Sequence, residues 1–334
     1  PYNDIIRKFI DMYAGRLRNQ VSFMLSACNF YMPIFEEALD AYGLPLELRY
    51  LPIIESALNP SAVSRAGASG LWQFMIGTGK IYGLESNSLV DERRDPIKAT
   101  WAAARYLKEM YDIYGDWNLV IAAYNCGPGT INKAIRRANG ETDYWKIYNY
   151  LPKETRGYVP AFIAANYVMT YYCDHNICPM ETNIPASTDT VQVNKNLHFE
   201  QIADLCNVPL DQIKSLNPQY KKQMIPGDSK PYTLRLPIDA ISTFIDKQDT
   251  IYAHRADELF RNRKTVAVKE ITPSTRKTTA AVAGKGKLTY YTIKSGDTLS
   301  TIAGKYGVTI KDIQRWNGMS NTKIAAGKRL KIYK

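Results

Sequence analysis

An internal repeat in the C-terminal half of the chain constrains the fold more than any other feature. From residue 190, the segment TVQVN alternates as a strand does, two short helical patterns follow, and YTLRLP adds a second alternating strand. The same order returns over residues 288–334. Repetition at this scale predicts two small α+β modules. The copies align at these pairs: Leu197 with Leu299, Ile202 with Ile302, Ala203 with Ala303, Val208 with Val308, Ile213 with Ile313, Asn217 with Asn317 and Leu236 with Leu330.

The region before the repeat has a helical pattern. Its apolar side chains recur at spacings of three and four. Asp95 before Pro96, and Asp116 before WNLVIAAYN, place a capping carboxylate where a helix is expected to begin. The sequence therefore predicts a multidomain chain. Its expected parts are a mainly helical domain over 1–182, a first module over 186–240, a helical connector over 241–263, a flexible basic linker over 264–287 and a second module over 288–334.

The charge of the chain bears on its partners. The formal net charge is +11, and many of the basic residues fall between Arg263 and Lys287, in the expected linker. A basic chain is compatible with nucleic acid and equally with an anionic cell wall or membrane surface. Because a nucleic-acid function would rest on net charge alone, we expect no nucleic-acid partner.

Histidine and cysteine usage argues against metal and triad chemistry. His175, His198 and His254 lie far apart, and none has another histidine at a metal-ligand spacing. Cys173 and Cys178 flank His175 without a second Cys/His pair nearby, so a local disulfide in an oxidising compartment is the alternative to a metal site. We expect neither a metal nor a cofactor.

The densest cluster of chemistry-bearing residues is LPIIESALNPSAVSRAGASGLWQFM, residues 51–75. Its one carboxylate is Glu55, which on a helix would share an apolar face with Leu51 and Leu58, while Pro52 would start or kink that helix. An apolar environment raises the pKa of a glutamate and keeps it protonated, as proton donation to a glycosidic oxygen requires. A capped, structural Glu at a helix end is the alternative.

Polar residues near this cluster favour a sugar site. The run SRAGASGLWQFM is rich in Gly and Ala, so its backbone can approach a ligand closely, and it carries Ser64 and Gln73. The segment AAYNCGPGTI ends a helix at a Gly-Pro-Gly turn, which would expose Tyr124 and Asn125 at the edge of a cleft.

Four ordered motifs carry a family resemblance: ES at 55–56, GASGLWQFM at 67–75, AYNCGPG at 123–129 and ETRGYVP at 154–160. They resemble the motifs of the family 1 lytic transglycosylases, whose fold is similar to goose-type lysozyme. The two C-terminal repeats resemble LysM modules, which bind glycans that contain N-acetylglucosamine. The resemblance covers nearly the whole chain.

The resemblance implies roles for particular residues. Glu55 matches the catalytic acid, which later acts as a base. The matched substrate-binding residues are Ser64, Gln73, Met75, Tyr124, Asn125, Glu154, Arg156 and Tyr158, of which Tyr124 would bond the catalytic Glu or the sugar. The matched glycan-binding residues of the second LysM module are Gly296, Asp297, Thr298, Asn317 and Ile324. The first module lacks the GDTL turn, so its sugar binding is open.

The implied reaction is non-hydrolytic cleavage of the β-1,4 bond between N-acetylmuramic acid and N-acetylglucosamine in peptidoglycan, which leaves 1,6-anhydromuramic acid ends. The resemblance also implies a periplasmic monomer that is attached to the outer membrane by a segment before residue 1. A goose-type lysozyme-like hydrolase is one alternative, with Asp91, Asp95 or Glu154 as the second carboxylate. A non-catalytic LysM scaffold that binds peptidoglycan is the other.

Overall fold

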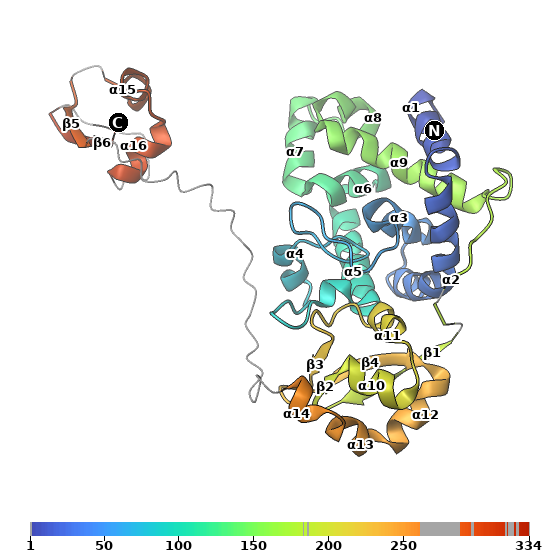
Figure 1. Cartoon of the computed structure of the whole chain (residues 1–334). Helices are drawn as coiled ribbons and strands as arrows, with labels where there is room; N and C mark the ends of the chain where they lie inside the picture. The colour runs from blue at the N-terminus through green and yellow to red at the C-terminus, as the bar shows by residue number, and fades with distance from the viewer. Residues whose placement is uncertain are drawn as a thin grey trace. The chain divides into compact units, whose positions relative to one another are not determined.

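The computed structural model describes residues 2–182, 184–185, 187–260, 288–294, 297–317, 319, 324 and 327–333. The chain divides into two compact units, Pro1–Thr272 and Pro273–Lys334 (Figure 1). The predicted linker over 264–287 and the predicted glycan-binding residue Gly296 lie outside the described residues.

The first unit begins with a helical region. Its elements are α1 (Asp4–Ala14), α2 (Arg18–Ala41), η1 (Leu46–Tyr50), α3 (Leu51–Ser56), α4 (Ile76–Ile81), η2 (Glu92–Arg94), α5 (Pro96–Tyr114), α6 (Trp117–Cys126), α7 (Pro128–Arg137), α8 (Tyr144–Ile147), η3 (Tyr148–Tyr150) and α9 (Lys153–Thr170). The caps are those expected from the sequence, because the Asp95 and Asp116 carboxylates accept hydrogen bonds from the first backbone amides of α5 and α6.

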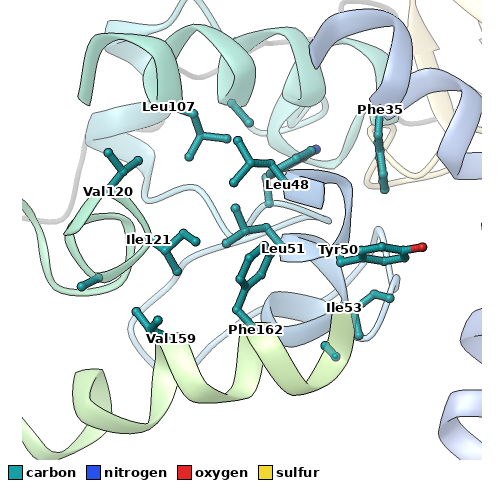
Figure 2. Close-up of a cluster of buried hydrophobic side chains, with 14 of the residues drawn as sticks. Phe35, Leu48, Tyr50, Leu51, Ile53, Leu107, Val120, Ile121, Val159 and Phe162 are labelled. Atoms are coloured by element: carbon teal, nitrogen blue, oxygen red, sulfur yellow. The ribbon is translucent and has the colours of Figure 1, made fainter. Parts of the chain in front are cut away.

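The core of this region forms around α3. Figure 2 shows Leu51 and Ile53 of this short helix beside Val159 and Phe162 of α9. Trp72 is fully buried nearby, and its indole N–H donates to Thr100 Oγ1 at 2.9 Å. Burying one such apolar side chain contributes about 1.5–3 kcal/mol. Helix α3 is therefore anchored on one side by the core, which leaves its other side for the site described below.

The first module follows in the same unit. Its elements are β1 (Thr188–Val193), β2 (Asn196–His198), α10 (Phe199–Cys206), α11 (Leu210–Leu216), β3 (Met224–Pro226), β4 (Tyr232–Pro237), α12 (Ile238–Asp246), α13 (Gln248–Ala253) and α14 (Ala256–Leu259). Strand β1 pairs antiparallel with β4, and β2 with β3. The stretch expected as a helical connector contributes Phe244 and Ile251 to the core of this module.

The structure corrects one pair of the repeat alignment. Leu197 lies in the short strand β2, whereas Phe199 begins α10 as Leu299 begins α15 (Leu299–Tyr306). The two helices start after matching caps, His198 and Thr298. The pairing of Leu197 with Leu299 was therefore wrong, because Phe199 holds the position in the first module that Leu299 holds in the second.

The first module packs directly on the helical region. Leu89 and Val90, from the segment before η2, belong to the buried cluster of the module and not to that of the helices. Val90 forms an antiparallel bridge with Tyr220.

The second unit contains the other module. Strand β5 (Leu288–Thr292) pairs antiparallel with β6 (Arg329–Tyr333), and α15 and α16 (Ile310–Trp316) lie between them in the chain. Among the residues that the structure describes in this module, the buried core consists of Tyr291, Ile293, Leu299, Ile302, Ala303, Ile313, Leu330 and Ile332. The expected fold class, a mainly helical domain followed by two small α+β modules, is confirmed.

Two further observations concern the described part of the chain. None of its helices combines the length and the apolar character that a membrane span requires. All five cysteines lie in this part, and all are free thiols.

Candidate active site

The local sequence places Glu55 near the end of α3. Pro52 stands in the first turn of this helix, where its missing N–H costs nothing. The helix ends at Ala57, which adopts a left-handed conformation with φ 51°, and Leu58 follows with φ 58°. Leu58 is buried, but it does not lie on the helical face with Glu55 as expected, because the backbone turns sharply after Ser56.

A folded loop, residues 62–75, lies against α3. Short antiparallel bridges join Ser69 to Val63 and to Phe74. The Ser56 hydroxyl donates to the backbone oxygen of Leu71 at 2.9 Å, so the residue after Glu55 ties the helix to this loop. We call residues 62–75 the active-site loop.

Two predicted residues of the active-site loop reach the same cleft as Glu55. A pocket of about 440 Å³ is lined by Glu55, Ser64 and Gln73. Gln73 adopts a left-handed conformation with φ 48°, and its amide group donates to the Gly70 oxygen at 2.8 Å. The Ser64 hydroxyl accepts a hydrogen bond from the Ala68 amide at 3.0 Å. The structure thus brings together residues up to 18 positions apart.

The pocket has lining residues that the motifs did not reveal. Tyr13 from α1 and Gln20 from α2 face it from the N-terminal helices. Burial raises the pKa of Tyr13 to about 12, so its phenol stays protonated and can donate a hydrogen bond. No local pattern marks either residue, because both are single polar groups in ordinary helices.

The pKa of the Glu55 carboxyl group lies well above that of an exposed glutamate. Part of the residue faces the cleft, but burial of the carboxyl group raises its pKa to about 7. The hydrogen bond from the Tyr158 hydroxyl acts in the opposite direction, and the nearby charge of Glu154 adds to the increase. Burial is the dominant cause.

The two predicted tyrosines divide their roles in the structure. Tyr158 donates to the Glu55 carboxyl group, whereas the Tyr124 hydroxyl donates to the Trp72 backbone oxygen at 2.7 Å. Tyr124 still lies close enough to Glu55 for the carboxylate charge to raise the pKa of its phenol, after the larger effect of burial. Tyr124 therefore lies near Glu55 and holds the backbone of the active-site loop at Trp72.

Other predicted substrate-binding residues make contacts outside the Glu55 pocket. The Asn125 side-chain oxygen accepts from the Thr155 hydroxyl at 2.9 Å. Arg156 donates to the backbone oxygens of Leu151 and Asn149, each at 3.0 Å, and so holds the turn before α9. Met75 and Glu154 are exposed, and Met75 precedes α4.

The proposed second carboxylates of a hydrolase occupy different environments. Asp91 is buried in an ion pair with Arg93, and Asp95 is the cap of α5. Glu154 remains near Glu55. Within the described ranges, no three His, Cys, Asp or Glu side chains gather as a metal site would require.

The predicted glycan-binding residues of the second module also have structural contacts. The Asp297 carboxylate accepts from the Tyr291 hydroxyl and the Lys294 amide, each at 2.8 Å, and Thr298 caps α15. The Asn317 amide group bonds the Ile313 and Lys331 backbones. Ile324 packs against the module core.

Comparison with known proteins agrees with this arrangement. A "Transglycosylase SLT domain" matches residues 32–147, a "Lytic transglycosylase MltD, LysM-like domain" matches 187–253, and a "LysM domain" matches 291–332. The membrane-bound lytic murein transglycosylase D of Escherichia coli K12 is 31% identical over 336 residues, which cover 99% of this chain and 69% of that protein. The chain belongs to the lytic murein transglycosylase family.

Two further similarities cover a smaller part of the chain. The soluble lytic murein transglycosylase of Escherichia coli K12 is 33% identical over 124 residues, which cover 35% of this chain and 19% of that protein. The crystal structure of the 70 kDa soluble lytic transglycosylase from Escherichia coli is 29% identical, with a TM-score of 0.38, and the match covers 43% of this chain and 24% of the other. The predicted family and class of enzyme, a lytic transglycosylase with LysM-like modules, are confirmed.

Proposed function

We propose that this lytic transglycosylase cleaves the peptidoglycan strand without water, with Glu55 first as acid and then as base. Glu55 donates its proton to the oxygen between N-acetylmuramic acid and N-acetylglucosamine, and the bond from C1 to that oxygen breaks. The C6 hydroxyl of the same muramic acid then attacks C1, and Glu55 takes its proton. A 1,6-anhydromuramic acid end results.

The position of Glu55 in the pocket carries this proposal, and burial there raises its pKa to about 7. A group that must donate a proton and then accept one works best when its pKa lies near the operating pH. A single carboxylate completes the cycle, because the nucleophile belongs to the substrate. Ser64 and Gln73 lie in the same pocket and are proposed to orient the N-acetyl group and the neighbouring sugar.

The remaining expected residues are proposed to act around this centre. Met75, Asn125, Glu154 and Arg156 would form or support the subsites beside the cleavage point, while Tyr124 and Tyr158 hold the acid and its loop. The second module is proposed to bind the glycan through the surface near Asp297, Thr298 and Ile324. We place the enzyme in the periplasm as a monomer, attached to the outer membrane.

Product analysis by mass spectrometry tests the proposal. Purified protein is incubated with peptidoglycan, and muropeptides one water lighter than lysozyme products, without a reducing muramic end, are expected. Reducing ends would instead indicate a hydrolase, with Glu154 as its second carboxylate. Wall binding without soluble products would indicate a scaffold. In each assay, Glu55→Gln is expected to bind glycan and to lose nearly all cleavage, because an amide cannot donate an equivalent proton.

A further inference from the structure

A buried arginine links the first module to the active-site loop. Arg93 is 5% exposed, and its guanidinium group donates to the backbone oxygens of Gly67 at 2.8 Å and Phe74 at 2.9 Å. These oxygens lie at the two ends of the segment that contains Gln73. The same guanidinium forms a two-pronged ion pair with Asp91, at 2.9 and 2.8 Å. This fork-shaped contact needs arginine, because lysine offers one point charge.

The active-site loop also packs on the backbone of Arg93. A Cβ atom added to Gly70 would lie 1.7 Å from the Arg93 backbone oxygen. Loop and arginine therefore meet without any space between them. A displacement of Arg93 must be transmitted to the loop, since a packed interior does not absorb such shifts.

The first module contacts the segment that carries Asp91. The Asp91 amide donates to the Gln219 oxygen at 2.9 Å, and the Lys221 amide donates to the Leu89 oxygen at 2.8 Å. Val90, between them, is fully buried in the module core. The Lys221 ammonium donates to the Asn87 oxygen at 2.8 Å and lies 3.8 Å from the Asp91 carboxylate.

The contacting segment of the first module follows α11. Met224 follows Asn217 by the same seven positions that separate Ile324 from Asn317. Ile324 is partly exposed, but Met224 is 1% exposed, and Tyr220 in the same segment is 5% exposed. Met224 is buried in the module's own core, whereas Gln219, Tyr220 and Lys221 make the contacts with the segment before η2.

We propose that the first LysM-like module is a positioning element of the active site, which holds the active-site loop through Asp91 and Arg93. Arg93 is a positioning residue: it does not line the pocket, but it fixes the backbone that carries Ser64 and Gln73. The effect on catalysis rests on the proposed function, whereas the mechanical connection does not.

The test combines amide hydrogen exchange with steady-state kinetics on the full chain. Arg93→Lys keeps the positive charge but loses the two-bond contact with Asp91. Val90→Ala shortens the side chain that packs in the module core. A second module-side variant, Lys221→Met, removes the contacts of the ammonium group with the Asn87 oxygen and the Asp91 carboxylate, and leaves the module core unchanged. Lys222→Met is the matched control, because Lys222 is the exposed neighbour.

Faster exchange is expected at the amides of Ser69 and Gly70 in Arg93→Lys, Val90→Ala and Lys221→Met, but not in Lys222→Met. For Arg93→Lys, kcat should fall about 10- to 100-fold, as a misplacement near 1 Å does, with a smaller change in KM. The double variant Arg93→Lys/Val90→Ala should lose little more than Arg93→Lys alone, because both act through one connection.

Unchanged exchange in the active-site loop, or additive losses of kcat, would overturn the proposal. Exchange is measured without substrate, so it tests the connection even if the parent protein cleaves no glycan. If the parent cleaves normally and the variants show unaltered exchange in the active-site loop, the positioning role is rejected and the proposed function stands.

Discussion

The Tyr158 hydroxyl donates a hydrogen bond to the Glu55 carboxyl group across a separation of 103 residues. Burial raises the pKa of this carboxyl group, and the Tyr158 bond counteracts part of that increase. The pKa of this acid on α3 is therefore set by opposing effects, and the one that lowers it comes from α9.

Removing the tyrosine hydroxyl should shift the pH profile upward. Tyr158→Phe deletes the donor that favours the carboxylate, so the pKa of Glu55 rises above about 7. The alkaline limb of kcat/KM, measured on soluble glycan, is expected to move to higher pH. Tyr124→Phe is the comparison, because its hydroxyl bonds a backbone oxygen and not Glu55. An alkaline limb that stays in place would show that the Tyr158 bond does not tune the acid.

Removing the neighbouring charge should shift the profile the other way. The negative charge of Glu154 raises the pKa of Glu55, so Glu154→Gln lowers that pKa. The alkaline limb is expected to move to lower pH. High salt should weaken the effect in the parent, because Glu154 is exposed and its field is screened. A shift to higher pH would contradict this assignment.

The raised pKa of Glu55 should make the free energy of unfolding decrease as the pH rises. The pKa of its carboxyl group is raised from 4.5 to about 7 by folding. Between these values the unfolded chain releases the proton and the folded chain keeps it, so stability falls across the window and levels off above pH 7. Glu55→Gln lacks this dependence. Its free energy of unfolding, relative to the parent, should increase by up to about 3 kcal/mol between pH 4 and 8. Denaturant titrations at both pH values measure the difference.

Gly70 should not tolerate a side chain. Its φ is +89°, and a Cβ atom would meet the Arg93 oxygen at 1.7 Å. Gly70→Ala is therefore expected to destabilise the fold by at least about 1–3 kcal/mol and to lower cleavage. Gly77→Ala is the control, because Gly77 lies in α4 with nothing within 4 Å of an added Cβ. Equal thermal stability of the two variants would disprove the close contact.

Asn317 offers a test between a structural and a glycan-binding role. Its side chain bonds the Ile313 oxygen and both backbone groups of Lys331, and so joins α16 to β6. Asn317→Ala is expected to weaken the second module by about 1–3 kcal/mol, seen as faster amide exchange in β5 and β6. If exchange stays unchanged while glycan affinity falls, then the side chain acts on the ligand.

Much of the fold could be predicted because its signals are local. Helix starts at Asp95 and Asp116, and the break at Gly127, depend on side chains and backbone conformations within a few residues. The repeat revealed both modules because each copy preserves the same short elements. The left-handed turn at Ala57 and Leu58 was missed, because neither residue type favours that conformation.

The sequence by itself determined the chemical groups at the site. Glu55, Ser64 and Gln73 lie within one short stretch, so their proximity follows from local folding. Only the tertiary structure decided which groups shift the pKa of Glu55 and which groups fix the active-site loop. That Tyr158 bonds Glu55, and that Arg93 bonds the backbone of the active-site loop, depends on how distant elements pack. Hydrogen bonds and burial act over a few ångströms in space, whatever the separation along the chain, and therefore leave no local pattern to read.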